Sequence, residues 1–322
     1  MKIKIFHSYP ECSSLLAIIN DHYRINATKM YLYRDMIGSV YFLESDNRKY
    51  VFKLFRREDT EQVLQSLEII SYLRSFDYPV VTVIAMPDSG AMHMMLDLPE
   101  GKRAGVLYEF LEGTVPDFAA GDITAVGQQI GRLHNLMANY PKPLIRRAKS
   151  FYIDRYIDLL RENGYDAAKT ATLAEYGDRL WGNMEQLPGG FCHGDLHSGN
   201  MIKIGERFVL FDFDVASHTY PVIDAATLSD GTNYNRLDDS AYDNTRRKFE
   251  RFYQGYFRER TLTDREIDAI FDFIAIRHYE LNATITEYRM PFRGMSFMSV
   301  AGFDDQYEWL MRWREMSGTK SA

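Results

Sequence analysis

A short polar loop between two apolar runs is the feature that most constrains how this chain can fold. The loop, His193 to Asn200, follows the apolar pair Phe191-Cys192 and precedes the strand-like run Met201 to Ile204. A second polar element, Phe211 to Asp214, follows after one short hairpin. Strands on both sides would hold the loop at its two ends, so we expect its Asp and Asn side chains to occupy defined positions.

The side chains of these two elements suit phosphoryl transfer assisted by a metal ion. Such a reaction needs a carboxylate that orients the attacking hydroxyl and takes its proton, and oxygen ligands for Mg²⁺. Asp195 suits the first role. Asn200 and Asp212 suit the second, because one amide and one carboxylate add little negative charge near the phosphates. Taken alone, each would equally well cap a surface turn, but the set in this order favours the catalytic interpretation.

The loop resembles the HGDxxxxN motif of the aminoglycoside phosphotransferase and choline kinase-like superfamily, the small-molecule branch of the protein-kinase-like fold. His193-Gly194-Asp195 and Asn200 match this motif, and Asp212 matches the Asp that follows it on a hairpin. The resemblance implies that Asp195 is the catalytic base, that Asn200 and Asp212 bind Mg²⁺, and that His193 is structural. It also implies that Asp224 anchors the loop by hydrogen bonds. The alternative is that Asp224 caps the helix that follows it, and the two roles are compatible.

The first third of the chain alternates apolar and polar residues, as strands do. We expect strands at Met30–Tyr33, Val40–Leu43, Tyr50–Phe55, Tyr78–Ile84, Met92–Leu96 and from Ala104 toward Gly113, with a helix from Glu58 to Ser75.

Lys53 lies in one of these apolar strands, where an unpaired ammonium would be costly. In the kinase-like fold, a strand Lys binds the nucleotide phosphates and pairs with a helix Glu. The resemblance therefore implies that Lys53 pairs with Glu68, with Glu61 as the second candidate. The alternative is a solvated Lys on an edge strand.

The strand that begins at Ala104 ends in a hinge linker if the resemblance holds. The linker backbone at Tyr108, Glu109, Phe110 and Leu111 would then contact the adenine of ATP, whereas the simpler alternative is the last strand of a sheet. The glycine-rich G-x-G-x-x-G loop of protein kinases is absent from the sequence, so the choice between ATP and GTP stays open.

The predicted fold class is α+β, a two-lobed protein-kinase-like fold. Residues 1–107 would form a nucleotide-binding lobe with an antiparallel sheet and a helix, residues 108–113 the hinge linker, and residues 114–322 a larger, mainly helical catalytic and substrate-binding lobe. The expected helices are Ile123–Asn139, Ser150–Arg161, Thr172–Leu187, Tyr242–Arg260, Asp264–Tyr288 and Asp304–Met316. Arg277 to Glu280 is a candidate for the acceptor pocket.

Charge and composition narrow the choice of partners. The net charge of −7 and the pI near 5.7 argue against nucleic-acid binding and favour a cationic acceptor. Two cysteines, Cys12 and Cys192, fit a reducing compartment. No apolar run is long enough to span a membrane and the N-terminus lacks a signal-type apolar core, so we expect a soluble, cytoplasmic protein.

The expected function is ATP-dependent transfer of the γ-phosphate to a hydroxyl of a small molecule. The acceptor would be an amino alcohol, a homoserine-like metabolite, a sugar or an aminoglycoside. A compact bacterial protein Ser/Thr kinase is the first alternative, and the short segment between Asp212 and Tyr220 weighs against it. A non-catalytic nucleotide-binding protein is the second, and the intact set of reactive groups weighs against that.

Overall fold

A computed structural model describes residues 3, 5, 7–289 and 302–318. The chain groups into two compact units, one of Met1–Thr114 with Ile202–Asp214 and one of Val115–Met201 with Val215–Ala322. The predicted boundaries near residues 107 and 114 stay a prediction. The grouping adds that Ile202–Asp214, which follows the polar loop, folds with the N-terminal residues.

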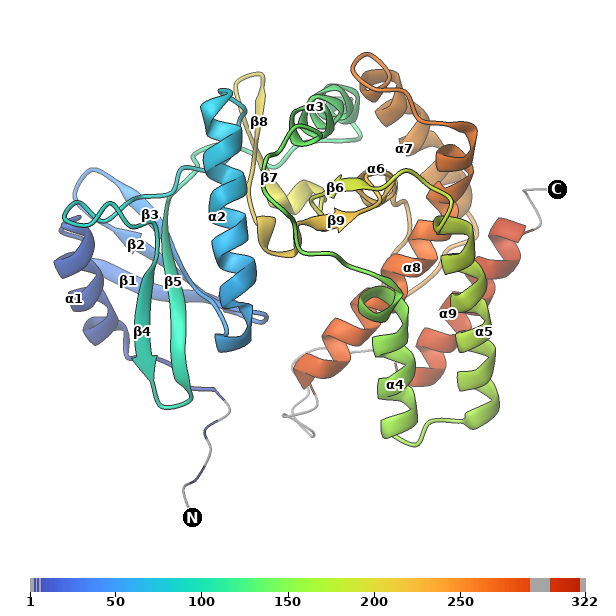
Figure 1. Cartoon of the computed structure of the whole chain (residues 1–322), viewed down its shortest axis with the longest axis horizontal. Helices are drawn as coiled ribbons and strands as arrows, with labels where there is room; N and C mark the ends of the chain where they lie inside the picture. The colour runs from blue at the N-terminus through green and yellow to red at the C-terminus, as the bar shows by residue number, and fades with distance from the viewer. Residues whose placement is uncertain (1–2, 4, 6, 290–301, 319–322) are drawn as a thin grey trace. The chain divides into compact units, whose positions relative to one another are not determined.

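The first unit is built on a five-stranded antiparallel sheet with the strand order β1-β2-β3-β5-β4 (Figure 1). The strands are β1 (Lys29–Asp35), β2 (Ser39–Glu44), β3 (Lys49–Leu54), β4 (Met94–Leu98) and β5 (Gly101–Glu109). Alternate residues of β2 and β3 are buried, because a strand turns successive side chains to opposite faces. Buried residues of helix α1 (Cys12–Tyr23) pack in the same core as these strands.

Helix α2 (Thr60–Ser75) and a two-stranded ribbon complete the first unit. The ribbon consists of β7 (Met201–Ile204) and β8 (Arg207–Leu210), and its bridge from Lys203 to Thr114 joins it to the end of the N-terminal segment. Most expected strands and the helix after β3 are therefore confirmed.

The strand expected at Tyr78–Ile84 is wrong. The segment forms isolated bridges instead of a ladder, from Val80 to Leu210 of β8 and from Val83 to Tyr108 of β5. The physical reason is that its backbone hydrogen bonds are divided between two different strands, and Pro79 has no amide hydrogen to donate.

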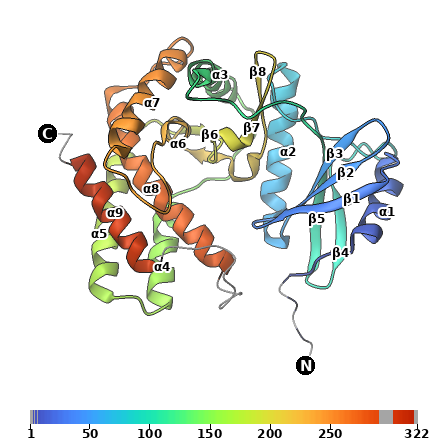
Figure 2. The same cartoon turned by 180° about the vertical axis from the view of Figure 1, so that it is seen from behind.

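The second unit is mainly helical, with a small antiparallel pair formed by β6 (Gly190–Cys192) and β9 (Ser217–Thr219) (Figures 1 and 2). Its helices are α3 (Asp122–Met137), α4 (Arg155–Glu162), α5 (Ala167–Met184), α6 (Val222–Ser229), α7 (Ala241–Tyr256), α8 (Asp264–Arg289) and α9 (Phe303–Gly318). The expected helix at Ser150–Arg161 begins instead with a π-helical turn, Ser150–Asp154.

Glycines set the close crossing of α3 and α7. A Cβ added at Gly255 of α7 would lie 1.8 Å from the Thr124 carbonyl oxygen, and one at Gly127 of α3 would lie 2.1 Å from the Phe252 carbonyl oxygen. Both distances are far below van der Waals contact, so the two backbones touch where side chains would otherwise stand.

The N-terminal sheet and the helical second unit confirm the expected α+β fold class. Across the described residues, no helix is both long and apolar enough to cross a membrane.

Candidate active site

The polar loop of the second unit leaves the end of β6, which is paired with β9. Gly194 takes a φ of +84°, and a Cβ there would lie 2.9 Å from the Val215 carbonyl oxygen, so the turn requires glycine. A short 3₁₀ turn, Ser198–Asn200, then brings the chain back, and the backbone N–H of Asn200 donates to the His197 carbonyl at 2.9 Å. The loop therefore doubles back on itself and brings Asn200 to Asp195.

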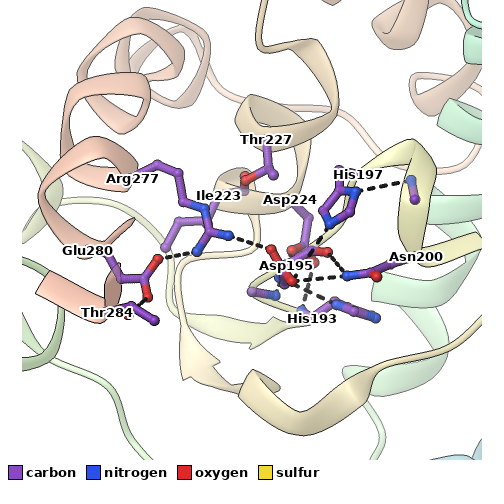
Figure 3. A network of polar contacts seen from close by, with 12 residues as sticks. His193, Asp195, His197, Asn200, Ile223, Asp224, Thr227, Arg277, Glu280 and Thr284 are labelled. Atoms are coloured by element: carbon purple, nitrogen blue, oxygen red, sulfur yellow. Dashed lines mark hydrogen bonds and ion pairs between the residues drawn. The ribbon is translucent and has the colours of Figure 1, made fainter. Parts of the chain in front are cut away.

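Asp224 holds the start of this loop. Its buried carboxylate, drawn near His193 in Figure 3, accepts the backbone N–H of His193 at 2.8 Å and that of Gly194 at 2.9 Å. His134 Nε2 lies 3.1 Å from Asp224 Oδ2. Burial raises the pKa of Asp224, but His134 and the His193 side chain and backbone more than offset it, so the pKa lies below the usual value. Asp224 sits in the first turn of α6, whose N-cap is Pro221, and its side chain serves the loop.

Asp195 is held from two sides. The Asn200 amide nitrogen donates to Asp195 Oδ2 at 2.9 Å and to the Asp195 carbonyl at 2.8 Å. Arg277 of α8 forms an ion pair with Asp195 Oδ1 and a second one with Glu280, as Figure 3 shows. Asn200 Oδ1 has no hydrogen-bond partner among the described residues, so the oxygen that a hard cation would take is not engaged by the protein there.

Lys53 organises a second charged group, which lies in the first unit. Its strand places it opposite Val40 and Val106, and its ammonium lies 2.8 Å from Asp212 Oδ1 and 2.5 Å from Asp214 Oδ2. Burial lowers the pKa of Lys53, but the two carboxylates raise it by more, so Lys53 stays charged.

The two carboxylates differ in their surroundings. Burial and the charge of Asp212 raise the pKa of Asp214 to about 7, although the charge of Lys53 acts in the opposite direction. Asp212 takes a φ of +64°, a left-handed conformation that few residues other than glycine adopt and that clusters at functional sites.

In the structure, Lys53 pairs with carboxylates to which the sequence had given no such role. Lys53 forms its ion pairs with Asp212 and Asp214, whereas Glu68 lies on an exposed side of α2 and Glu61 is also exposed. A pairing of Lys53 with Glu68 or Glu61 stays a prediction. Sequence reasoning gave Asp214 no role, although its place two residues after Asp212 was the available signal.

The expected hinge residues lie at the end of β5. Tyr108 pairs with Val51 and Glu109 with Tyr50, and the Phe110 amide donates to the Lys49 carbonyl at 3.2 Å. Leu111 follows and is half-buried. Their contact with adenine stays a prediction.

The residues that could bind a divalent cation do not form a cluster of acids. Among the described residues, no three His, Cys, Asp or Glu side chains gather as a metal-binding group. Mg²⁺ in phosphotransferases does not need such a cluster, because it takes one or two protein ligands and completes its shell with phosphates and water. Asn200 of the second unit and Asp212 of the first each carry a side-chain oxygen of the kind that Mg²⁺ takes, and their binding of the ion stays a prediction.

An antiparallel sheet that carries Lys53, followed by a helical unit with an anchored His-Gly-Asp loop, defines the protein-kinase-like class of phosphotransferase. The sequence profile of the phosphotransferase enzyme family matches residues 34–265. The chain therefore belongs to the phosphotransferase enzyme family, which confirms the resemblance carried by the polar loop.

The chain is also similar to individual proteins. An uncharacterized protein of Deinococcus radiodurans is 24% identical over 97% of this chain and 92% of its own length. A homoserine kinase of Rhodopseudomonas palustris is 26% identical over 72% of this chain and 71% of its own. The solved structure of an amicoumacin kinase in complex with AMP-PNP, Ca²⁺ and Ami is similar with a TM-score of 0.72 and 21% identity, covering 96% of this chain and 93% of that one.

Proposed function

We propose that this protein transfers the γ-phosphate of ATP to a hydroxyl group of a small molecule. The observation that carries the proposal is the held position of Asp195, whose carboxylate lies between the Asn200 amide and Arg277. A base must be positioned before the hydroxyl arrives, because phosphoryl transfer depends mainly on alignment and charge.

Each residue has one task in the proposed reaction. Asp195 accepts the proton of the acceptor hydroxyl, and Lys53 binds the nucleotide phosphates in place of its present carboxylate partners. Asn200 and Asp212 supply oxygen ligands for Mg²⁺, which, when bound, neutralises charge on the phosphates. The amicoumacin kinase that was solved with AMP-PNP and Ca²⁺ supports a nucleotide and a divalent cation.

The acceptor classes are amino alcohols, homoserine-like metabolites, sugars and aminoglycosides. The homoserine kinase and amicoumacin kinase relatives support a small hydroxyl compound, and the family does not narrow the choice further. ATP consumption is measured with each acceptor class and with a generic protein substrate. Phosphorylation of the generic protein substrate, without phosphorylation of any small acceptor, would favour the alternative, a protein Ser/Thr kinase.

Two variants test the assigned roles. Asp195→Asn should abolish phosphate transfer and leave nucleotide affinity nearly unchanged, because the amide keeps the shape but takes no proton. Asp212→Ala should weaken binding of the magnesium nucleotide in a calorimetric titration. Wild-type turnover by the first variant, or wild-type affinity in the second, would contradict the assignment.

A further inference from the structure

Arg147 is a buried cation without an ion-pair partner in the described part of the chain. It is 8% exposed, and its buried Nε has no hydrogen-bond partner there. The guanidinium carbon lies 3.8 Å from the centre of the Phe151 ring, which satisfies none of its N–H donors. The backbone N–H of Arg147 donates to the carbonyl of His218 in β9, the partner strand of β6. Arg147 is thereby tied to the small sheet from which the polar loop leaves.

A buried guanidinium without an ion pair is unfavourable for the free energy of the folded protein unless an anion binds to it. Burial lowers the pKa of Arg147, yet a guanidinium keeps its proton in proteins, so its charge remains. Buried charges are normally paired and hydrogen-bonded. A buried arginine whose Nε has no hydrogen-bond partner and whose charge has no ion pair therefore indicates a negatively charged ligand.

The neighbouring cations extend this positive region toward the catalytic base. The guanidinium carbon of Arg155 lies 4.8 Å from the same Phe151 ring, so two like charges share one aromatic side chain. Arg155 lies 3.5 Å from Glu280 Oε1, and Glu280 also pairs with Arg277, which holds Asp195. Figure 3 shows Arg277 between Glu280 and Asp195.

The acids in this region are already occupied by other arginines. Glu280 is shared between Arg155 and Arg277, and Glu287 lies 3.4 Å from Arg155 Nε. Burial lowers the pKa of Arg147 by more than Glu280 raises it through its charge, and Glu280 forms no ion pair with Arg147.

We propose that Arg147, with Arg155 beside it, binds an oxyanion of the acceptor, either a carboxylate or a phosphate. The planar guanidinium matches both groups through paired N–H donors. That the same molecule also presents a hydroxyl to Asp195 rests on the proposed function. The oxyanion gives the acceptor a local charge opposite to the one expected from the net charge of the chain.

Binding is tested first, with probes that do not depend on the acceptor. Malonate and inorganic phosphate are titrated at constant ionic strength into protein saturated with Mg²⁺ and AMP-PNP, which keeps the probes from the nucleotide phosphate positions. Arg147→Gln should lower the affinity about tenfold or more. Arg146→Gln is the matched control, because Arg146 is the exposed neighbour and loses the same charge. Unchanged affinity in Arg147→Gln, or no saturable binding of either probe to the wild type, would overturn the proposal.

A conservative variant protects the test against misfolding. Arg147→Lys keeps the charge but not the paired donors, so it should lose affinity while retaining the thermal midpoint of the wild type. If Arg147→Gln does not fold, Arg147→Lys and Arg155→Gln decide the outcome by the same titration, and wild-type affinity in both would overturn the proposal.

Acceptor pairs then separate this inference from the proposed function. L-homoserine is compared with 3-aminopropan-1-ol, which lacks only the carboxylate, and glycerol 3-phosphate is compared with glycerol. Arg147→Gln should raise KM for the anionic member of a pair and leave the other member unchanged. Anion binding that depends on Arg147 without any phosphate transfer would sustain the oxyanion site and remove the proposed function. Phosphate transfer whose rate and KM depend neither on the anionic group of the acceptor nor on Arg147 would sustain the proposed function and remove the oxyanion site.

Discussion

Replacing Asp224 with Ala removes the acceptor on which the start of the catalytic loop depends. The carboxylate is fully buried and accepts the backbone N–H groups of His193 and Gly194, with His134 as a third neighbour. Each buried donor left without an acceptor costs about 1–3 kcal/mol. Loss of one partner of a buried ionic group costs about 3–5 kcal/mol, which we take as the expected loss of unfolding free energy for Asp224→Ala.

The assay is urea unfolding followed by fluorescence, together with kcat on a substrate found by the acceptor screen. Asp158→Ala is the matched control, because Asp158 pairs with Arg161 at a site where both side chains are 61% exposed. The control should stay within about 0.5 kcal/mol of the wild type. In Asp224→Ala, kcat should fall more than nucleotide affinity, since the loop that carries Asp195 loses its anchor. A stability loss equal to that of the control would refute the reasoning.

The same carboxylate predicts a pH dependence of stability. The native pKa of Asp224 is lowered, so the unfolded chain binds its proton more readily than the native protein does. Its contribution is therefore complete above the unfolded pKa of about 3.9 and is lost as the pH falls through the lower native pKa. The difference in unfolding free energy between wild type and Asp224→Asn should shrink below about pH 4, measured by urea titrations across that range. A difference that stays constant down to acid would contradict this role.

Two further variants test the charged group of the first unit and the helix crossing of the second. Lys53→Met should weaken binding of a magnesium nucleotide about tenfold or more in a calorimetric titration, because it leaves two close carboxylates without their cation; Lys49→Met, an exposed change on the same strand, should have little effect. Gly255→Ala should lower the free energy of unfolding by about 1–3 kcal/mol, since its methyl would meet a backbone oxygen. Gly182→Ala, a helical position with open space around it, should instead stabilise by up to about 1 kcal/mol, and equal shifts in unfolding midpoint would contradict the close crossing.

Much of the fold could be predicted because its elements carry clear periodic patterns. The alternation at Val40–Leu43 and Tyr50–Phe55 follows from one face of each strand being buried, and the structure has strands there. Tyr78–Ile84 is equally apolar but bridges two strands one residue at a time. Local pattern could not reveal this, because the hydrogen-bond partners lie far away in the chain.

In the candidate site, too, some features could be predicted from the sequence and others could not. The order of Asp195, Asn200 and Asp212 could be recognised because all three follow closely along the chain. The carboxylate partners of Lys53 in the structure lie about 160 residues further along the chain, whereas the resemblance implied a Glu of the next helix. Only tertiary structure brings Asp214 to Lys53.

The charge of the acceptor illustrates where composition stops being informative. A net charge of −7 acts through the solvent, where screening at physiological salt limits it to a Debye length of about 8 Å. A group bound in a pocket responds instead to the side chains that it touches, at short range and with little screening. Arg146 and Arg147 are adjacent residues of the same type, yet one is exposed and the other is buried without an ion pair in the described part of the chain. The buried one determines which charge is favourable there, and this is why the oxyanion follows from Arg147 although the chain as a whole is acidic.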